Sequence, residues 1–104
     1  MKKKENKKVF ISGKITGESI YYCTEKFSKA MWGLVYDGFD IIINPLSMDG
    51  IHFGVSHEDA MKLCLDELKT CTHIYMLKDW DQSKGAKIEH EFAKKNGLTI
   101  IYEK

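Results

Sequence analysis

The stretch Asp79 to Ala93, D-W-D-Q-S-K-G-A-K-I-E-H-E-F-A, decides how the chain is interpreted. It follows the apolar run 74–77, and so it predicts a strand, a short polar loop and then a helix. At about 100° per residue, one side of this helix carries Gly85, Ala86, Ile88, Phe92, Ala93 and Asn96, with Glu89 in the middle of them. The other side carries Lys87, His90, Glu91, Lys94 and Lys95. Because a buried carboxylate is costly without a partner, Glu89 is expected to meet one or to line a cavity.

Length and charge limit the classes of function. A chain of 104 residues forms one domain, predicted at 8–104 after a flexible basic tail at 1–7. Five lysines fall within the first eight residues, and the chain contains no arginine, so no surface for polymeric nucleic acid is expected. No apolar run is long enough to cross a membrane and no leader is recognised, which together predict a cytoplasmic protein.

Regular alternation of strand and helix patterns predicts the fold class. Strands are expected at 8–12, 40–44, 73–77 and 99–102, with helices at about 18–36, 56–70 and 83–96. Because right-handed crossovers make such strands parallel, we predict an α/β domain, flavodoxin-like or Rossmann-like, with about four strands and helices on both faces. Ligands bind such sheets at the carboxyl ends of the strands.

Several side chains near that edge have two interpretations. The apolar loop 46–55 fits a lid, a wall that stacks on a base, or a subunit contact. Trp80 fits base stacking or a subunit contact, and His57 fits a satisfied core residue or a base. The cysteines, Cys23, Cys64 and Cys71, lack a C-x-x-C pair and fit reduced core thiols. Neither they nor the histidines have metal-ligand spacing, so no metal and no cofactor is expected.

Three motifs carry a resemblance to a known family. They are V-F-I-S-G-K-I-T-G at 9–17, I-N-P-L at 43–46, and S-K-G-A-K-I-E at 83–89 with Ala93 four residues beyond Glu89. Together they resemble the nucleoside 2-deoxyribosyltransferase superfamily, most of all its small, uncharacterised phage and bacterial relatives. The resemblance spans nearly the whole chain and agrees with the predicted fold.

The resemblance implies a function and a set of site residues. Glu89 would attack the anomeric carbon of a 2′-deoxyribonucleoside or its 5′-monophosphate, and the covalent deoxyribosyl intermediate would pass to another base or to water. It also implies at least a homodimer. The expected substrate-binding residues are Ser12, Gly13, Ile15, Gly17, Asn44, Pro45, Trp80, Ser83, Lys84 and Gly85, of which the last three would face a phosphate.

The chain departs from the family pattern at three positions. Cys64 stands where the second helix usually carries a carboxylate, so Asp79 or Asp81 is expected to supply the missing catalytic acid. Glu91 replaces a common glycine, and Lys14 replaces a frequent proline or serine. The loss of the acid leaves an alternative open, a catalytically inactive nucleotide-binding module that senses or sequesters its ligand. An oligomerising scaffold is a third possibility, for which loop 46–55 is the only argument.

Overall fold

The computed structural model describes residues 7–48 and 55–104. Most of the predicted basic tail and most of the apolar loop 46–55 lie outside these residues. The elements in chain order are β1 (Lys8–Ser12), α1 (Ile20–Tyr36), β2 (Ile41–Ile43), α2 (His57–Leu68), β3 (His73–Met76), α3 (Lys84–Lys95) and β4 (Thr99–Tyr102). Two single-turn 3-10 helices, η1 (Pro45–Ser47) and η2 (Trp80–Gln82), follow β2 and β3.

The strands form one parallel sheet in the order β2-β1-β3-β4, which confirms the predicted fold class. Ser12 pairs with Met76 in the register of β1 and β3, and Met76 pairs with Tyr102 in β4. The chain leaves β1 toward β2 on one side and later returns to β3 on the other. The carboxyl ends of β1 and β3 are therefore the switch point of the sheet, where ligands of such folds bind.

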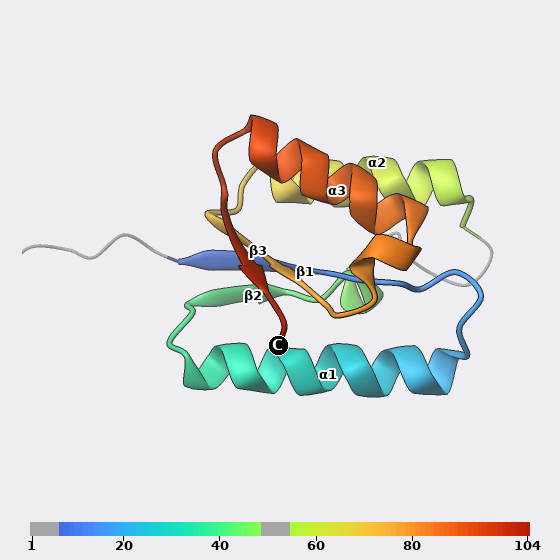
Figure 1. Cartoon of the computed structure of the whole chain (residues 1–104), viewed down its shortest axis with the longest axis horizontal. Helices are drawn as coiled ribbons and strands as arrows, with labels where there is room; N and C mark the ends of the chain where they lie inside the picture. The colour runs from blue at the N-terminus through green and yellow to red at the C-terminus, as the bar shows by residue number, and fades with distance from the viewer. Residues whose placement is uncertain (1–6, 49–54) are drawn as a thin grey trace, which may run out of the picture.

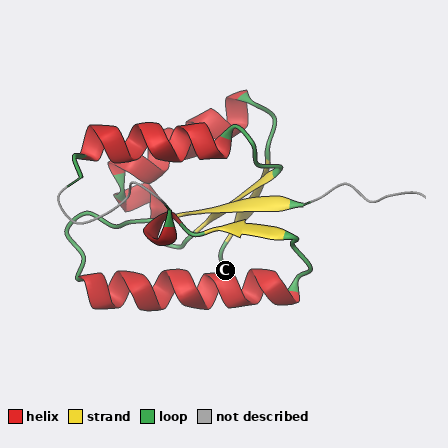
Figure 2. Cartoon of the chain, turned by 180° about the vertical axis from the view of Figure 1, so that it is seen from behind, coloured by secondary structure: helices red, strands yellow, loops and turns green. Residues whose placement is uncertain are grey.

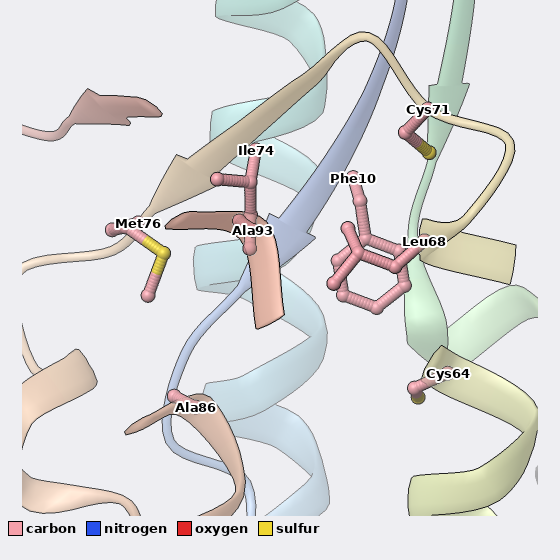
Figure 3. Close-up of a cluster of buried hydrophobic side chains, with 8 residues drawn as sticks. All are labelled: Phe10, Cys64, Leu68, Cys71, Ile74, Met76, Ala86 and Ala93. Carbon is pink, nitrogen blue, oxygen red and sulfur yellow. The ribbon is translucent and has the colours of Figure 1, made fainter. Parts of the chain in front are cut away.

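Helices cover both faces of the sheet, as Figures 1 and 2 show. Val9 and Ile11 of β1 point toward α1 and pack against Phe27 and Leu34. Phe10 points the other way, into a core shared with α2 and α3 (Figure 3). This alternation in a strand without polar residues at its centre is what burial on both faces requires.

Local capping explains where the elements begin and end. The side chain of Ser19 accepts a hydrogen bond from the backbone N–H of Tyr22, so α1 begins at Ile20 rather than at residue 18. Asn44 caps η1 by accepting from the N–H of Leu46 at 3.0 Å, so β2 ends one residue earlier than predicted. Gly97 follows α3 at φ 72°, a conformation that favours glycine.

The packing face of α3 is only partly the predicted one. Ala86, Glu89 and Ala93 are buried as expected, but Ile88 is 39% exposed, and the prediction that His90 faces solvent is wrong because it is 9% exposed. Trp80 in η2 lies over His90, with ring centroids 4.2 Å apart, and Tyr102 Oη lies 2.8 Å from His90 Nε2. The short helix η2 therefore covers the side of α3 that carries His90, which helical periodicity assigns to solvent.

Candidate functional site

A cavity of about 450 Å³ opens at the switch point. Its walls come from the loop after β1, the first turns of α1, the start of η1 and the first halves of α2 and α3. The lining residues are Ile11, Gly13, Ile15, Thr16, Glu18, Ile20, Cys23, Thr24, Pro45, Leu46, Val55, His57, Ala60, Met61, Cys64, Ser83, Gly85, Ala86 and Glu89. Most are apolar or small, and the volume is in the range of small-molecule sites, roughly 300–1,000 Å³.

Glu89 is the buried acid of this cavity. Its side chain comes from the second turn of α3 and is 7% exposed. The hydroxyl of Ser12, the last residue of β1, donates a hydrogen bond to Glu89 Oε1 at 2.5 Å. Ser12 is itself 1% exposed, so the carboxyl is fixed from behind by a group that belongs to the central strand. The end of β1 and the face of α3 together position Glu89 at the cavity wall.

Burial raises the pKa of Glu89 from 4.5 to about 7, although hydrogen bonds from Ser12 and Cys64 act in the opposite direction. Cys64 is also buried, and burial together with the charge of Glu89 raises the pKa of its thiol to about 12. At neutral pH Cys64 is therefore a neutral S–H group beside a carboxyl group that is about half ionised. Cys64 thus contacts the buried carboxyl group but brings no second charge.

The helices α2 and α3 form one wall between them. A Cβ atom at Gly85 would lie 3.5 Å from Cε1 of His57, so the imidazole rests against the start of α3. His57 and Cys64 are two turns apart, about 10 Å along α2. Cys64 meets Glu89 at the inner end of this wall, and His57 meets Gly85 at the outer end. Among the described lining residues, His57 is the only basic one.

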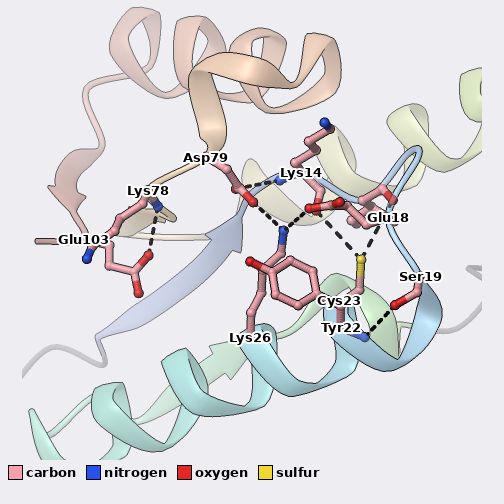
Figure 4. A network of polar contacts seen from close by, with 10 residues as sticks. Lys14, Glu18, Ser19, Tyr22, Cys23, Lys26, Lys78, Asp79 and Glu103 are labelled. Carbon is pink, nitrogen blue, oxygen red and sulfur yellow. Dashed lines mark hydrogen bonds and ion pairs between the residues drawn. The ribbon is translucent and has the colours of Figure 1, made fainter.

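Gly13 brings the backbone of the first loop against the sheet. A Cβ atom at this position would lie 2.5 Å from Leu77 Cδ1, a distance that real side chains do not occupy. The loop is also held by Asp79, which accepts a hydrogen bond from the backbone N–H of Lys14 at 3.1 Å and forms an ion pair with Lys26 (Figure 4). The resulting contacts fix the loop that forms one side of the cavity.

The carboxylates at the end of β3 do not line the cavity. Asp79 is engaged by Lys14 and Lys26, and Lys26 also pairs with Glu18 at 3.4 Å. Asp81 is exposed, and its side chain has no hydrogen bond or ion pair within residues 7–48 and 55–104. The expectation that one of these two aspartates is the missing catalytic acid has no support in their positions. Asp79 instead anchors the first loop to α1.

The predicted substrate-binding residues divide into two groups. Gly13, Ile15, Pro45, Ser83 and Gly85 line the cavity, and Ser12 lies directly behind Glu89. The others do not line it: Gly17, Asn44, Trp80 and Lys84. Asn44 is used as a helix cap, Trp80 packs on His90, Gly17 forms a turn with φ 85°, and Lys84 is exposed at the start of α3.

Other lining residues were not predicted as site residues from the sequence. They include Thr16, Glu18, Cys23, Thr24 and Met61, whereas His57 was given two interpretations, a core residue or a base. Residues 57, 61 and 64 recur at helical spacing and so share one face of α2, but this spacing does not show that the first two turns of that face line a cavity. Within the described ranges, no three His, Cys, Asp or Glu side chains are grouped as metal ligands would be.

None of the helices described is both long and apolar enough to cross a membrane. Comparison with curated proteins and with solved structures gives no significant match. A family model described as a domain of unknown function, DUF4406, matches residues 7–102 and therefore covers all the strands and helices. The chain belongs to the DUF4406 family, and the cavity around Glu89 is the candidate site of a member of that family.

Proposed function

We propose that this protein cleaves or transfers the N-glycosidic bond of a deoxynucleoside or deoxynucleotide, with Glu89 as the nucleophile. The observation that carries the proposal is the position of Glu89: a buried carboxyl at the switch point, held by Ser12 and facing a cavity of about 450 Å³. The resemblance of the motifs at 9–17, 43–46 and 83–89 to nucleoside 2-deoxyribosyltransferases supports the same assignment.

The cavity offers a different environment at each end. The sugar would lie at the inner end, near Glu89 and the tight backbone at Gly13. The apolar side chains of Ile15 and Met61 suit the faces of a base. The outer end has the start of α3 at Ser83 and Gly85 with the imidazole of His57, which suits an anionic or hydrogen-bonding part of the ligand such as a phosphate.

The proposed reaction has two displacements at one carbon. In the first, an oxygen of the ionised Glu89 forms an ester bond to the anomeric carbon as the bond to the base nitrogen breaks, and the base leaves with the electron pair and takes up a proton. In the second, water or another base attacks the same carbon, loses a proton, and releases the carboxylate. Configuration is retained overall.

The ionisation of Glu89 limits this chemistry. A carboxyl with a pKa of about 7 is only partly ionised at neutral pH, so the first displacement should speed up as the pH rises through that value. The proton for the leaving base cannot come readily from Cys64, whose pKa is about 12. Water would supply it, which favours bases that leave without strong acid assistance.

A second candidate function is nucleotide binding without turnover. The specific observation in its favour is Cys64: beside Glu89 the cavity holds a thiol where the related enzymes hold a carboxylate. Asp79, which was expected to compensate, is instead engaged by Lys14 and Lys26. In this case the site would serve as a sensor or would sequester the nucleotide.

One experiment separates the two candidates. The wild-type protein, Glu89→Ala and the control Glu91→Ala are incubated with a panel of deoxynucleosides and their monophosphates, with and without an acceptor base, and released base is measured by chromatography. Glu91 is an exposed neighbour on the same helix. Base release by wild type and by the control, absent in Glu89→Ala, supports the enzyme. Saturable thermal stabilisation by a nucleotide without release supports the binding module. If the protein shows neither base release nor thermal stabilisation, both candidate functions are rejected.

A further inference from the structure

The outward side of α1 is unusually aromatic. On its helical wheel the buried residues are Cys23, Phe27, Ala30 and Leu34, and the positions directly opposite carry Tyr21, Glu25, Trp32 and Tyr36. Tyr21 is 80%, Trp32 60% and Tyr36 89% exposed. Single exposed apolar residues are ordinary, but here aromatic residues recur at both ends of the outermost line of one helix and form an exposed patch.

The arrangement of layers leaves this patch open. Figure 1 shows α1 as the only helix on its side of the sheet, whereas α2 and α3 lie together on the other side. Within residues 7–48 and 55–104, α1 packs on β1 and β2 through its buried stripe, and no other element covers its outer line.

The spacing along this line suits a second helix. Tyr21, Glu25, Ser28, Trp32 and Tyr36 follow one another at intervals of four, three, four and four residues. Intervals of three and four place side chains on a seam that packs against another helix. Ser28, at the centre, is small and would let two such helices approach closely.

Two copies of the patch present complementary charges to each other. Glu25 and Lys29 are exposed one turn apart, and no ion pair joins them in the part of the chain that the structure describes. In an antiparallel contact with a two-fold axis between them, Glu25 of each copy lies opposite Lys29 of the other. The same register brings Tyr22 near Trp32 of the second copy, and such reciprocity is the mark of an isologous interface.

The size of the patch is near the lower limit for a specific protein–protein contact. At about 200 Å² for a fully exposed aromatic side chain, Tyr21, Tyr22, Trp32 and Tyr36 together expose roughly 500 Å² per copy. Two copies would then bury up to roughly 1,000 Å² from these residues, and Val35 adds to it.

We infer that a second copy of this chain binds here: α1 of one copy packs antiparallel on α1 of the other, through Tyr21, Trp32 and Tyr36 and two reciprocal Glu25–Lys29 ion pairs. The inference rests on the exposed face of α1 and is independent of the chemistry at Glu89.

Sedimentation velocity over a concentration series tests the contact. Wild type should sediment as a dimer, and Trp32→Glu should raise the dissociation constant at least about 30-fold, as the loss of a central aromatic does in interfaces. Ile88→Glu, which places the same charge at an exposed apolar residue of α3 on the opposite face, should leave it unchanged. Circular dichroism of each variant confirms that the fold is retained.

A charge exchange gives the sharper result. Glu25→Lys should weaken the dimer, and adding Lys29→Glu in the same chain should restore it, because every facing pair is again of opposite sign. A wild-type protein that stays monomeric throughout the series overturns the inference. A dimer that Trp32→Glu leaves intact, or one that the charge exchange fails to restore, overturns it as well, because the contact then lies elsewhere.

Discussion

The substitution Glu89→Gln should stabilise the protein at alkaline pH while it removes the proposed nucleophile. Glutamine keeps the shape of the protonated side chain, and its carbonyl can accept the hydrogen bond that Ser12 now donates to Oε1. It differs in one respect, because it never carries the charge that burial makes unfavourable. Glu89→Gln is therefore expected to abolish activity and to raise stability at alkaline pH.

The magnitude follows from the pKa of Glu89. A rise from 4.5 to about 7 corresponds to about 3 kcal/mol, at about 1.4 kcal/mol for each pKa unit. The folded protein holds the proton more tightly than the unfolded chain, so this contribution to stability is fully present below about pH 4.5 and is lost as the pH rises through about 7. Glu89→Gln should match wild type near the lower value and exceed its free energy of unfolding by up to about 3 kcal/mol above the higher one.

Urea denaturation at a series of pH values, followed by tryptophan fluorescence, measures this difference. The matched control is Glu91→Gln, because Glu91 is exposed on the same helix and, within the residues described, pairs only with the exposed Lys94 at 3.7 Å. Its effect on the free energy of unfolding should be small and independent of pH. A difference between Glu89→Gln and wild type that does not grow with pH would refute the reasoning, since burial would then not have raised the pKa of Glu89.

Three further predictions concern the surroundings of that carboxyl. Ser12→Ala removes a hydrogen bond that lowers the pKa of the buried carboxyl, so the pH midpoint of activity should move upward; a pH–rate profile checks this, and an unchanged midpoint contradicts it. Gly13→Ala should lower the free energy of unfolding by about 1–3 kcal/mol, because the new Cβ would lie 2.5 Å from the side chain of Leu77. Gly85→Ala would make only ordinary van der Waals contacts, so it should keep or slightly raise the melting temperature. It should also narrow the cavity and weaken nucleotide binding. Thermal melts and titrations compare the two, and equal destabilisation would contradict the assigned contacts. Asp79→Ala should lower the free energy of unfolding by about 1–3 kcal/mol, whereas Asp81→Ala, at an exposed position, should change it little. A loss of turnover in Asp81→Ala would contradict the conclusion that Asp81 is not the catalytic acid.

The fold was predictable because each strand and helix has a strong local pattern. The run 9–11 without polar residues indicated a strand buried on both faces, and the spacing of Cys23, Phe27 and Leu34 gave the buried side of α1 correctly. Ile20 falls near that side by helical spacing but is exposed, because it follows the N-cap and lies at the rim of the cavity. Periodicity describes the middle of a helix better than its ends.

The site was predictable only where one residue was out of place. Glu89 stood out because a carboxylate on a packing face needs a reason, and the structure places it at the cavity. Glu18 gave no such signal, since a polar residue near the start of a helix is ordinary, and the position of His57 fitted a core residue as well as a base. Asp79 pairs with Lys26, which is far from it in sequence, and Trp80 packs on His90 across a turn that helical spacing does not describe. Local sequence patterns therefore could not predict either role.

The central claim is that Glu89 forms a covalent bond to the sugar, and capture of that intermediate tests it most directly. Wild type, Glu89→Gln and Glu91→Gln are mixed with the substrate found in the panel, quenched in acid, digested and examined by mass spectrometry. A deoxyribosyl adduct on the peptide that contains Glu89, present in wild type and Glu91→Gln and absent in Glu89→Gln, is the predicted result. Base release without any adduct on Glu89, or release that persists in Glu89→Gln, would contradict the account.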